Sequence, residues 1–382
     1  MKMRFFSAIV TLAVLLAACT GQKKARPSAP ATSRQQVLDI IHQVNRYWQA
    51  QKAPTERAFW DVAAYHTGNM EAYFLTRKEE YRKYSEAWAE HNQWKGAKSD
   101  NKAEWKHTYG EKDDYVLFGD WQICFQTYVD LYSLDKDPKK IARAREVMEY
   151  EMSTPQHHYW WWADGLYMVM PVMTKLYKVT GNPLYLEKLH KYFLFADSIM
   201  YDRDEQLYFR DAKYVFPKHK STNGKKDFWA RGDGWILAGL AKVLADLPQN
   251  DAHRELYISR YKGIAEAVKK AQQPEGYWTR SLLDPAHAPG PETSGTAFFT
   301  YGLLWGLNHG LLDAKEYGPV VQKSWDYLAK VALQPDGRVG YVQPIGERAI
   351  PGQVVDKNST ANFGVGAFLL AACEMYRYLD KR

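Results

Sequence analysis

The sequence predicts an all-α protein, an (α/α)6 barrel in which six helical hairpins close on themselves. Apolar residues recur at helical spacing in about twelve segments of the 382-residue chain. Few segments alternate strictly between apolar and polar residues, so strands should be few and short. A turn pattern also recurs between helices, and successive helices differ in composition, as expected for a repeated helical hairpin.

The expected helices follow one another with short connections. They lie near 34–50, 56–75, 77–94, 116–133, 138–150, 159–179, 183–201, 229–246, 252–272, 293–311, 315–332 and 359–379. Ser33 is a suitable N-cap for the first helix, because a serine hydroxyl there can accept a hydrogen bond from a backbone N–H. The loop stretches 206–216, 277–282 and 338–343 could hold short strands.

A weak repeat pairs the helices. In the stretches 131–138 and 176–183, Leu-Tyr ends one helix, and Asp or Asn caps the next, with Pro at its first position. The fourth, sixth, eighth, tenth and twelfth helices are rich in glycine and aromatic residues (TAFFTYGLLWGL), whereas odd-numbered helices are more charged (RKEEYRKYSEAWAEH). We therefore expect the even-numbered helices to form the inner ring of the barrel.

The first residues have the features of a targeting signal rather than of a folded domain. Lys2 and Arg4 precede a short apolar run that is too short for a transmembrane span with those flanks. Residues 16–19, Leu-Ala-Ala-Cys, resemble a bacterial lipobox, which predicts cleavage before Cys19 and lipid attachment to it; ordinary signal cleavage is the alternative.

Three parts are therefore expected. Residues 1–18 are a lipoprotein signal peptide, residues 19–32 are the lipidated cysteine with a flexible tether, and residues 33–382 are a single barrel domain. The membrane would be reached only through the lipid on Cys19. No acidic run follows Cys19, which favours a periplasm-facing lipoprotein of a bacterial cell envelope.

The composition narrows the function classes. The formal net charge of +7 falls to about +5 without the signal, and no basic run has the density that nucleic-acid binding needs. This mild positive charge would suit an acidic sugar. Aromatic residues make up 15% of the chain, and sugars stack on aromatic rings, although core packing also uses them. Cys124 and Cys373 lie in apolar contexts and should be core residues, without a disulfide framework.

The stretch 157–181 carries the strongest chemical signal. Three consecutive tryptophans precede Asp164, and an apolar helix follows it. A low dielectric there would raise the pKa of the carboxyl and keep it protonated, as a general acid requires. The alternative is that Asp164 is a capping or first-turn acid, which the helix dipole favours.

In such a barrel the loops that lead into the inner helices converge at one end. Almost every one of these helix starts joins an aromatic to a polar residue; the ones we select are Trp60, His66, Asp120, Trp162, Asp164, Trp229, Arg231, Trp235, Thr293 and Ser294. Asp120 and Asp164 would suit acid/base work on a glycosidic bond, although Asp120 could be a cap. Arg231 opposes the helix dipole, which indicates an anionic or polar ligand, or an ion pair between loops. The histidines are isolated, and their spacing predicts no metal site.

Four motifs carry a family resemblance. WWWADGLYM, FWARGDGW, ETSGTAFFTYGLLWG and GVGAFLLAACEMY occur in this order, in a likeness that runs from about residue 34 to the C-terminus. They resemble the unsaturated rhamnogalacturonyl hydrolases of glycoside hydrolase family 105, relatives of the unsaturated glucuronyl hydrolases of family 88. The resemblance implies an (α/α)6 barrel, which agrees with the helix count.

The resemblance also implies a reaction. Such enzymes remove a 4,5-unsaturated uronic acid from the non-reducing end of oligosaccharides that polysaccharide lyases produce. An Asp protonates C4, water adds at C5, and the resulting hemiketal opens and releases the next sugar. This chemistry needs no metal and no organic cofactor, and no obligate protein partner is evident.

The resemblance assigns roles to particular residues. Asp164 would be the acid/base, and Asp120 the second acidic residue, with Asp113 or Asp114 as alternatives because the family often has adjacent acids in that stretch. Trp229, Arg231 and Trp235 would line the subsite for the unsaturated sugar, and Trp60, His66, Trp162, Thr293 and Ser294 are the further substrate-binding candidates. Asp233 replaces the usual Asn, so we expect it to face Arg231 or to cap its helix.

Two competing interpretations stay open from the sequence. One is a different (α/α)6 carbohydrate enzyme, either a conventional glycosidase or a lyase. The other is a non-catalytic glycan-binding lipoprotein, which would keep the tryptophans but would not need Asp164.

Overall fold

The computed structural model describes Met1 and residues 32–381. The helices are α1 (Arg34–Gln51), α2 (Trp60–Thr76), α3 (Glu79–His91), α4 (Cys124–Asp135), α5 (Lys139–Ser153), α6 (Ala163–Thr180), α7 (Leu184–Met200), α8 (Ala230–Asp246), α9 (Arg254–Ala271), α10 (Thr293–Asn308), α11 (Ala314–Tyr327) and α12 (Asn362–Asp380). Two 3₁₀ turns, η1 (Lys102–Glu104) and η2 (Gly119–Trp121), and a π-helical turn, η3 (Leu328–Ala332), complete them. The predicted signal peptide, Cys19 and nearly all of the tether lie outside the described residues.

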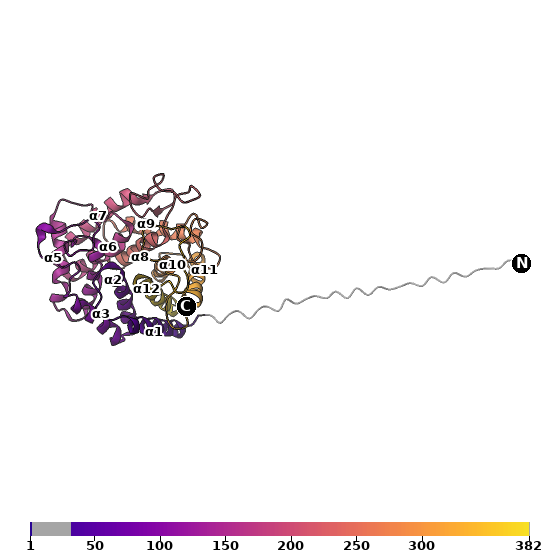
Figure 1. Cartoon of the computed structure of the whole chain (residues 1–382), viewed down its shortest axis with the longest axis horizontal. Helices are drawn as coiled ribbons and strands as arrows, with labels where there is room; N and C mark the ends of the chain where they lie inside the picture. The colour runs from indigo at the N-terminus through magenta and orange to yellow at the C-terminus, as the bar shows by residue number, and fades with distance from the viewer. Residues whose placement is uncertain (2–31, 382) are drawn as a thin grey trace. The chain divides into compact units, whose positions relative to one another are not determined.

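The even-numbered helices form a closed inner ring. Each of α2, α4, α6, α8, α10 and α12 packs against the next, and α12 packs against α2 (Figure 1). The odd-numbered helices cover this ring from outside: α3 packs on α2, α5 on α4, α7 on α6, α9 on α8, α11 on α10 and α1 on α12. The predicted (α/α)6 barrel is therefore confirmed, including the division into inner and outer helices.

The composition of the inner helices follows from their place. An inner helix contacts neighbours on nearly all sides, so it must be apolar almost all round. Glycine lets two such helices approach closely: a Cβ added to Gly68 on α2 would lie 2.3 Å from the carbonyl oxygen of Gly366 on α12. The outer helices have one face in water and keep their charged residues there.

The predicted caps are present. Ser33 and Gln36 form a capping box, in which the serine Oγ accepts from the Gln36 N–H at 3.2 Å and the Gln36 side chain accepts from the Ser33 N–H at 2.8 Å. The side chains of Asp137 and Asn182 each accept a backbone N–H two residues on, at 3.1 and 3.0 Å. These contacts explain why the same turn recurs before α5 and α7.

The described residues form fewer strands than the three loop stretches named above could have held. β1 (Tyr201–Asp202) pairs antiparallel with β2 (Leu207–Tyr208), within and just before the stretch 206–216. The stretches 277–282 and 338–343 contain only isolated bridges, Trp229 with Ser281 and Leu333 with Val339. These loop segments bond to helix starts and to other loops at the end of the barrel, so they have no neighbour with which to extend a sheet.

Two further expectations concern the cysteines and membrane-spanning helices. Cys124 and Cys373 are buried and free, as the apolar contexts predicted. No helix among the described residues has the length and apolar character to cross a bilayer.

Candidate active site

A cavity of about 260 Å³ opens at the end of the barrel where the inner helices begin. It is lined by Arg57, Phe59, Trp60, Asp61, Tyr109, Glu111, Asp120, Trp162, Asp164, Arg210, Ile345, Gly346 and Glu347. These residues come from the starts of α2 and α6, from η2, and from three loops. Loops that converge at one end of the barrel thus build the cavity, as the sequence predicted.

Two buried carboxyl groups lie in this cavity. Asp164 is in the first turn of α6 and is 7% exposed, and Asp120 is in η2 and is 6% exposed. Burial raises the pKa of Asp164, although Arg210 and Arg231 oppose the rise. Burial raises the pKa of Asp120 well above its usual range, and the charge of Asp164 raises it further. Both carboxyls therefore keep a proton more readily than an exposed Asp would, and the charge of one raises the pKa of the other.

Arg210 is the cation in ion-pair contact with Asp164, and no sequence motif marked it. Its Nε lies 3.4 Å from an Asp164 carboxylate oxygen, and its Nη1 lies 2.8 Å from Asp211 and 3.2 Å from Glu347. It belongs to the loop after β2, which carried no catalytic motif. The one signal was an Arg-Asp pair within the stretch 206–216, which was expected only to hold a short strand.

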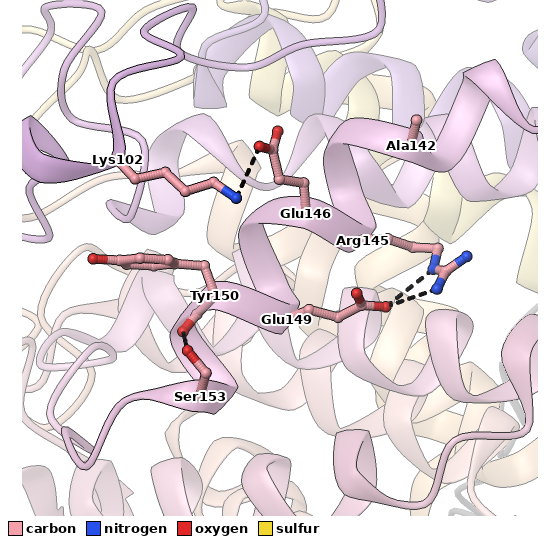
Figure 2. A pocket seen from close by; sticks show the side chains of 7 residues that line it. All are labelled: Lys102, Ala142, Arg145, Glu146, Glu149, Tyr150 and Ser153. Atoms are coloured by element: carbon pink, nitrogen blue, oxygen red, sulfur yellow. Dashed lines mark hydrogen bonds and ion pairs between the residues drawn. The ribbon is translucent and has the colours of Figure 1, made fainter.

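A larger hollow of about 540 Å³ lies on the outer helix α5 (Figure 2). Its charges are exposed and paired with one another, Lys102 with Glu146 at 3.2 Å and Arg145 with Glu149 at 3.0 Å. It lies away from the convergent helix starts and contains neither of the buried carboxyl groups. The smaller cavity, with its buried acidic pair, is therefore the candidate active site.

Comparison with known proteins agrees with this geometry. The family model described as Glycosyl Hydrolase Family 88 matches residues 32–379. The chain belongs to this family. The resemblance drawn from the four motifs, to family 105 and its relative family 88, is confirmed, and the protein is a glycoside hydrolase.

Individual relatives extend the comparison. Two proteins named "Unsaturated 3S-rhamnoglycuronyl hydrolase" are similar: one from Alteromonas sp., 30% identical over 98% of both chains, and one from Formosa agariphila, 40% identical over 56% of this chain. The latter match spans 57% of the Formosa protein. A solved structure named "Polysaccharide Lyase BACCELL_00875" superposes with a TM-score of 0.90 and 72% identity, over 92% of this chain and 99% of that one.

In this family 88 enzyme, backbone pairing sets the position of Arg210 relative to Asp164. Trp162 forms a bridge with Asp211, and the Ala163 N–H donates to the Arg210 carbonyl at 2.7 Å. The loop that carries the arginine is thereby fixed to the start of α6. Trp162 itself stacks on Phe118, with ring centroids 4.8 Å apart, and forms one wall of the cavity.

Arg231 does not line the cavity. Its guanidinium is fully buried and donates to the carbonyl oxygens of Gln343 at 2.7 Å and Pro344 at 3.0 Å, between the rings of Trp229 and Phe363. Direct contact of Arg231 with substrate, as the motif implied, is therefore not what this structure shows. The arginine instead holds the loop whose next residues, 345–347, form a cavity wall.

The other candidates at helix starts are packed away from the cavity. Trp229 donates to the Gln343 side chain at 2.9 Å, and Trp235 packs on Phe298 with ring centroids 4.2 Å apart. His66 stacks on Trp88 at 3.9 Å and bonds Ser85 at 2.9 Å. Thr293 bonds the Tyr327 hydroxyl, and Ser294 donates to Glu292. Their residue types gave no means of telling a buried helix start from one that faces the cavity.

Asp113 and Asp114, the alternatives for the second acid, lie outside the cavity lining. The Asp113 side chain accepts from the Lys98 N–H at 3.2 Å, and Asp114 pairs with Lys106. Asp120, Asp164, Trp60 and Trp162 are the predicted residues that the structure brings together. No group of three potential ligands that could hold a metal occurs within the described part of the chain.

Asp233 neither faces Arg231 nor caps α8, so the expectation for it is wrong. Its Oδ1 accepts the backbone N–H of Tyr208 at 2.8 Å and thereby holds β2 against α8, while Oδ2 has no hydrogen-bond partner among the described residues. Burial raises the pKa of Asp233 well above its usual range. Burial disfavours the ionised form of this carboxyl, so its protonated form fits this place better.

This arrangement predicts a pH-dependent effect of Asp233→Asn. A raised folded-state pKa gives stability that is complete below the unfolded-state pKa, about 3.9, and is lost as pH rises toward the folded-state value. The Asn variant keeps the Oδ1 acceptor and lacks this loss. We expect its unfolding free energy to gain on the wild type by up to about 1.4 kcal/mol per pH unit across that window.

Denaturant unfolding of both proteins from pH 4 to pH 8 measures this difference. Asp233→Ala serves as the control, since it also removes the acceptor for Tyr208 and should be destabilised at every pH. A constant difference between the Asn variant and the wild type would contradict the assignment.

Proposed function

We propose that this family 88 enzyme removes a 4,5-unsaturated uronic acid from the non-reducing end of lyase-generated oligosaccharides by hydrating the vinyl-ether double bond. The observation that carries the proposal is the buried pair Asp120 and Asp164 beside Arg210 in the cavity at the end of the barrel. The two relatives named for unsaturated rhamnoglycuronyl hydrolysis support the same substrate class.

The residues fit the steps of this reaction. The protonated carboxyl of Asp164 donates its proton to C4, which leaves a cation at C5 that the ring oxygen stabilises. Water adds at C5 and returns a proton to the carboxylate, so the acid is regenerated. The product is a hemiketal at C5. Cleavage of its bond to the ring oxygen opens the ring and leaves a hemiacetal at C1, which collapses to an aldehyde and releases the next sugar. One water is consumed for each glycosidic bond that is broken.

Substrate binding itself can place the proton on Asp164. In the free enzyme Arg210 opposes protonation of Asp164, and Asp120 has the larger rise in pKa. We assign the carboxylate of the uronic acid to Arg210, whose side chain is 13% exposed against 50% for Arg57, the other arginine of the cavity. Once that carboxylate shares the guanidinium, Arg210 stabilises the negative charge on Asp164 less strongly. The proton shared by the two carboxyls then moves toward Asp164.

This model predicts the pH dependence of turnover. Because the pair must carry a proton, kcat/KM should be constant at low pH and fall about tenfold per pH unit above the raised pKa of the pair. Arg210→Met should shift this falling limb to higher pH, because the guanidinium lowers the pKa of both carboxyls. A pH–rate profile checks both; a limb that stays in place, or moves to lower pH, contradicts the proton assignment.

The proposal is tested by following ultraviolet absorbance of the conjugated double bond with a panel of lyase-generated oligosaccharides. Hydration makes the absorbance fall. A lyase, which the name of one similar structure suggests, would make it rise on intact polysaccharide, and a conventional glycosidase would leave it unchanged. A flat or rising signal across the panel would therefore overturn the proposed function.

We also propose that the enzyme is a lipoprotein of the bacterial cell envelope, anchored through Cys19 and facing the periplasm. The support is the sequence of residues 1–19, with its basic start, apolar run and lipobox-like end. Cys19→Ala should move the protein from the membrane to the soluble fraction and abolish incorporation of labelled fatty acid. Retention of the variant in the membrane fraction would contradict the anchor.

A further inference from the structure

The active-site cavity has an exposed aromatic side chain at its mouth. Among residues 32–381, Tyr109 and Phe216 are the exposed residues of the Phe, Tyr and Trp types, at 62% and 38%, and Tyr109 is the one that lines the cavity. Ile345, which is 64% exposed, lines the cavity as well. Because large apolar side chains are usually buried, two exposed ones at this opening indicate a contact surface for the substrate.

Tyr109 ends an aromatic wall that begins at the floor of the cavity. Trp162 is buried and stacks on Phe118, with ring centroids 4.8 Å apart, and Phe118 meets the Tyr109 ring edge to face at 5.7 Å. Asp120 and Asp164 are buried like Trp162, whereas Tyr109 is open to solvent. The two carboxyl groups therefore lie at the floor, and the Tyr109 ring lies at the mouth.

The Tyr109 ring is held in place although it is exposed. Its hydroxyl donates to Glu111 Oε1 at 3.2 Å, and the other end of the side chain packs against Phe118. The next residue, Gly110, is buried, and its carbonyl oxygen accepts the Nε1–H of Trp121 at 3.1 Å. A side chain that is already fixed loses little conformational freedom when a ligand binds, so this ring is a preorganised surface.

Polar groups lie along the edge of this ring. Arg57 donates to Glu111 at 2.9 Å and lies over the ring of Phe59, 4.4 Å from its centroid. Because Arg57 and Glu111 pair with each other, the edge carries hydrogen-bonding groups without net charge. An aromatic face with polar groups beside it fits a sugar ring, whose C–H groups contact the face while its hydroxyls reach the edge.

We propose that Tyr109 forms the subsite for the leaving sugar by stacking on its ring. This inference rests on the proposed function, because that function places the unsaturated ring at the floor beside Asp164, and the next sugar then lies toward the mouth. The inference adds a specificity-determining residue and a substrate class: the uronic acid must be linked to a second sugar ring rather than to a small alcohol. Stacking uses the face of that ring and is compatible with a charged substituent on it.

A matched pair of substrates tests the subsite. One is the unsaturated oligosaccharide of the panel that loses its double bond fastest. The other is the methyl glycoside of the same unsaturated uronic acid, which has no second ring. Loss of double-bond absorbance gives kcat/KM for each. We expect the wild type to favour the oligosaccharide by at least about tenfold, because only that substrate can stack on Tyr109.

Variants assign this preference to the aromatic ring. Tyr109→Ala should bring the ratio of the two kcat/KM values within about threefold of one, whereas Tyr109→Phe keeps the ring and should keep the ratio above about fivefold. Tyr150→Ala is the matched control: it makes the same change in the hollow on α5 (Figure 2) and should leave the ratio unchanged. Because both substrates are measured with the same protein sample, a smaller folded fraction cancels from the ratio.

Salt separates stacking from charge recognition. The loss of kcat/KM that Tyr109→Ala causes with the oligosaccharide should be the same at low and at high salt, since contact with a ring face is not screened by ions. A loss that disappears at high salt would mean that the variant acts by releasing the paired charges of Arg57 and Glu111, and it would overturn the stacking.

The outcomes separate this proposal from the proposed function. A wild-type ratio close to one, or a ratio that Tyr109→Ala does not change, would overturn the subsite and leave the hydration reaction intact. A ratio that Tyr109→Phe lowers as far as Tyr109→Ala would assign the effect to the hydroxyl and would also overturn the stacking. If no oligosaccharide of the panel loses its double bond, the proposed function itself fails, and this inference with it.

Discussion

Asp164→Asn is expected to lower kcat for double-bond hydration by at least about 10²–10⁴-fold, the usual contribution of a general acid. The amide has the shape of the carboxyl and cannot deliver a proton to C4. Because the fold keeps this carboxyl buried with a raised pKa, its replacement by a neutral amide should not lower the melting temperature. Loss of activity would then be a loss of chemistry, with the fold and the cavity retained.

Asp113→Asn is the matched control, since it makes the same change in the same region of sequence for a residue that lies outside the cavity lining. It should keep wild-type turnover. Asp120→Asn should lose activity as well, because the pair would lose the group with the larger rise in pKa. Near-native turnover by Asp164→Asn, together with an inactive Asp120→Asn, would transfer the acid role to Asp120.

The parts of this site that the sequence could predict are those fixed by helical periodicity. Asp120, Asp164, Trp60 and Trp162 lie at or just before starts of inner helices, and closure of the ring brings those starts together whatever the loops do. A count of apolar spacings is therefore enough to locate them. The pKa rise at Asp164 also follows from burial, which the tryptophan run indicated.

The residues that could not be predicted come from loops. Arg210, Glu111 and Glu347 belong to long connections, and their positions depend on contacts between segments far apart in the sequence. Arg231 shows the same difficulty for a residue that the sequence did identify. The helix dipole makes an arginine unusual at this helix start, but whether its partner is a ligand or a loop depends on residues 343–346, which local sequence does not place.

Arg231 is therefore expected to matter most for stability. It ties the 343–346 loop to α8, and its Nη2 also lies 3.4 Å from the carbonyl oxygen of Gly346. A second buried contact holds the same loop: the Glu292 carboxylate accepts the Gln343 N–H at 3.0 Å. Arg231→Met would leave carbonyl oxygens without donors and remove a cation near that carboxylate. We expect a loss of about 3–5 kcal/mol in unfolding free energy, as when one partner of a buried charged network is removed.

Urea unfolding measures the change in unfolding free energy. Two further variants show whether that change comes from the hydrogen bonds of Arg231. Arg231→Lys keeps the charge but cannot reach two carbonyls with a planar fork, so it should fall between the wild type and Arg231→Met. Arg338→Met removes a partly exposed arginine from the connection just before this loop and should change stability by less than about 0.5 kcal/mol.

If Arg231→Met instead kept its stability and lost only substrate affinity, the guanidinium would have to leave its carbonyls in the complex and bind the sugar directly. Since residues 345–347 form a wall of the cavity, loss of the tie should also lower kcat/KM, and the two losses should appear together across the Lys and Met variants.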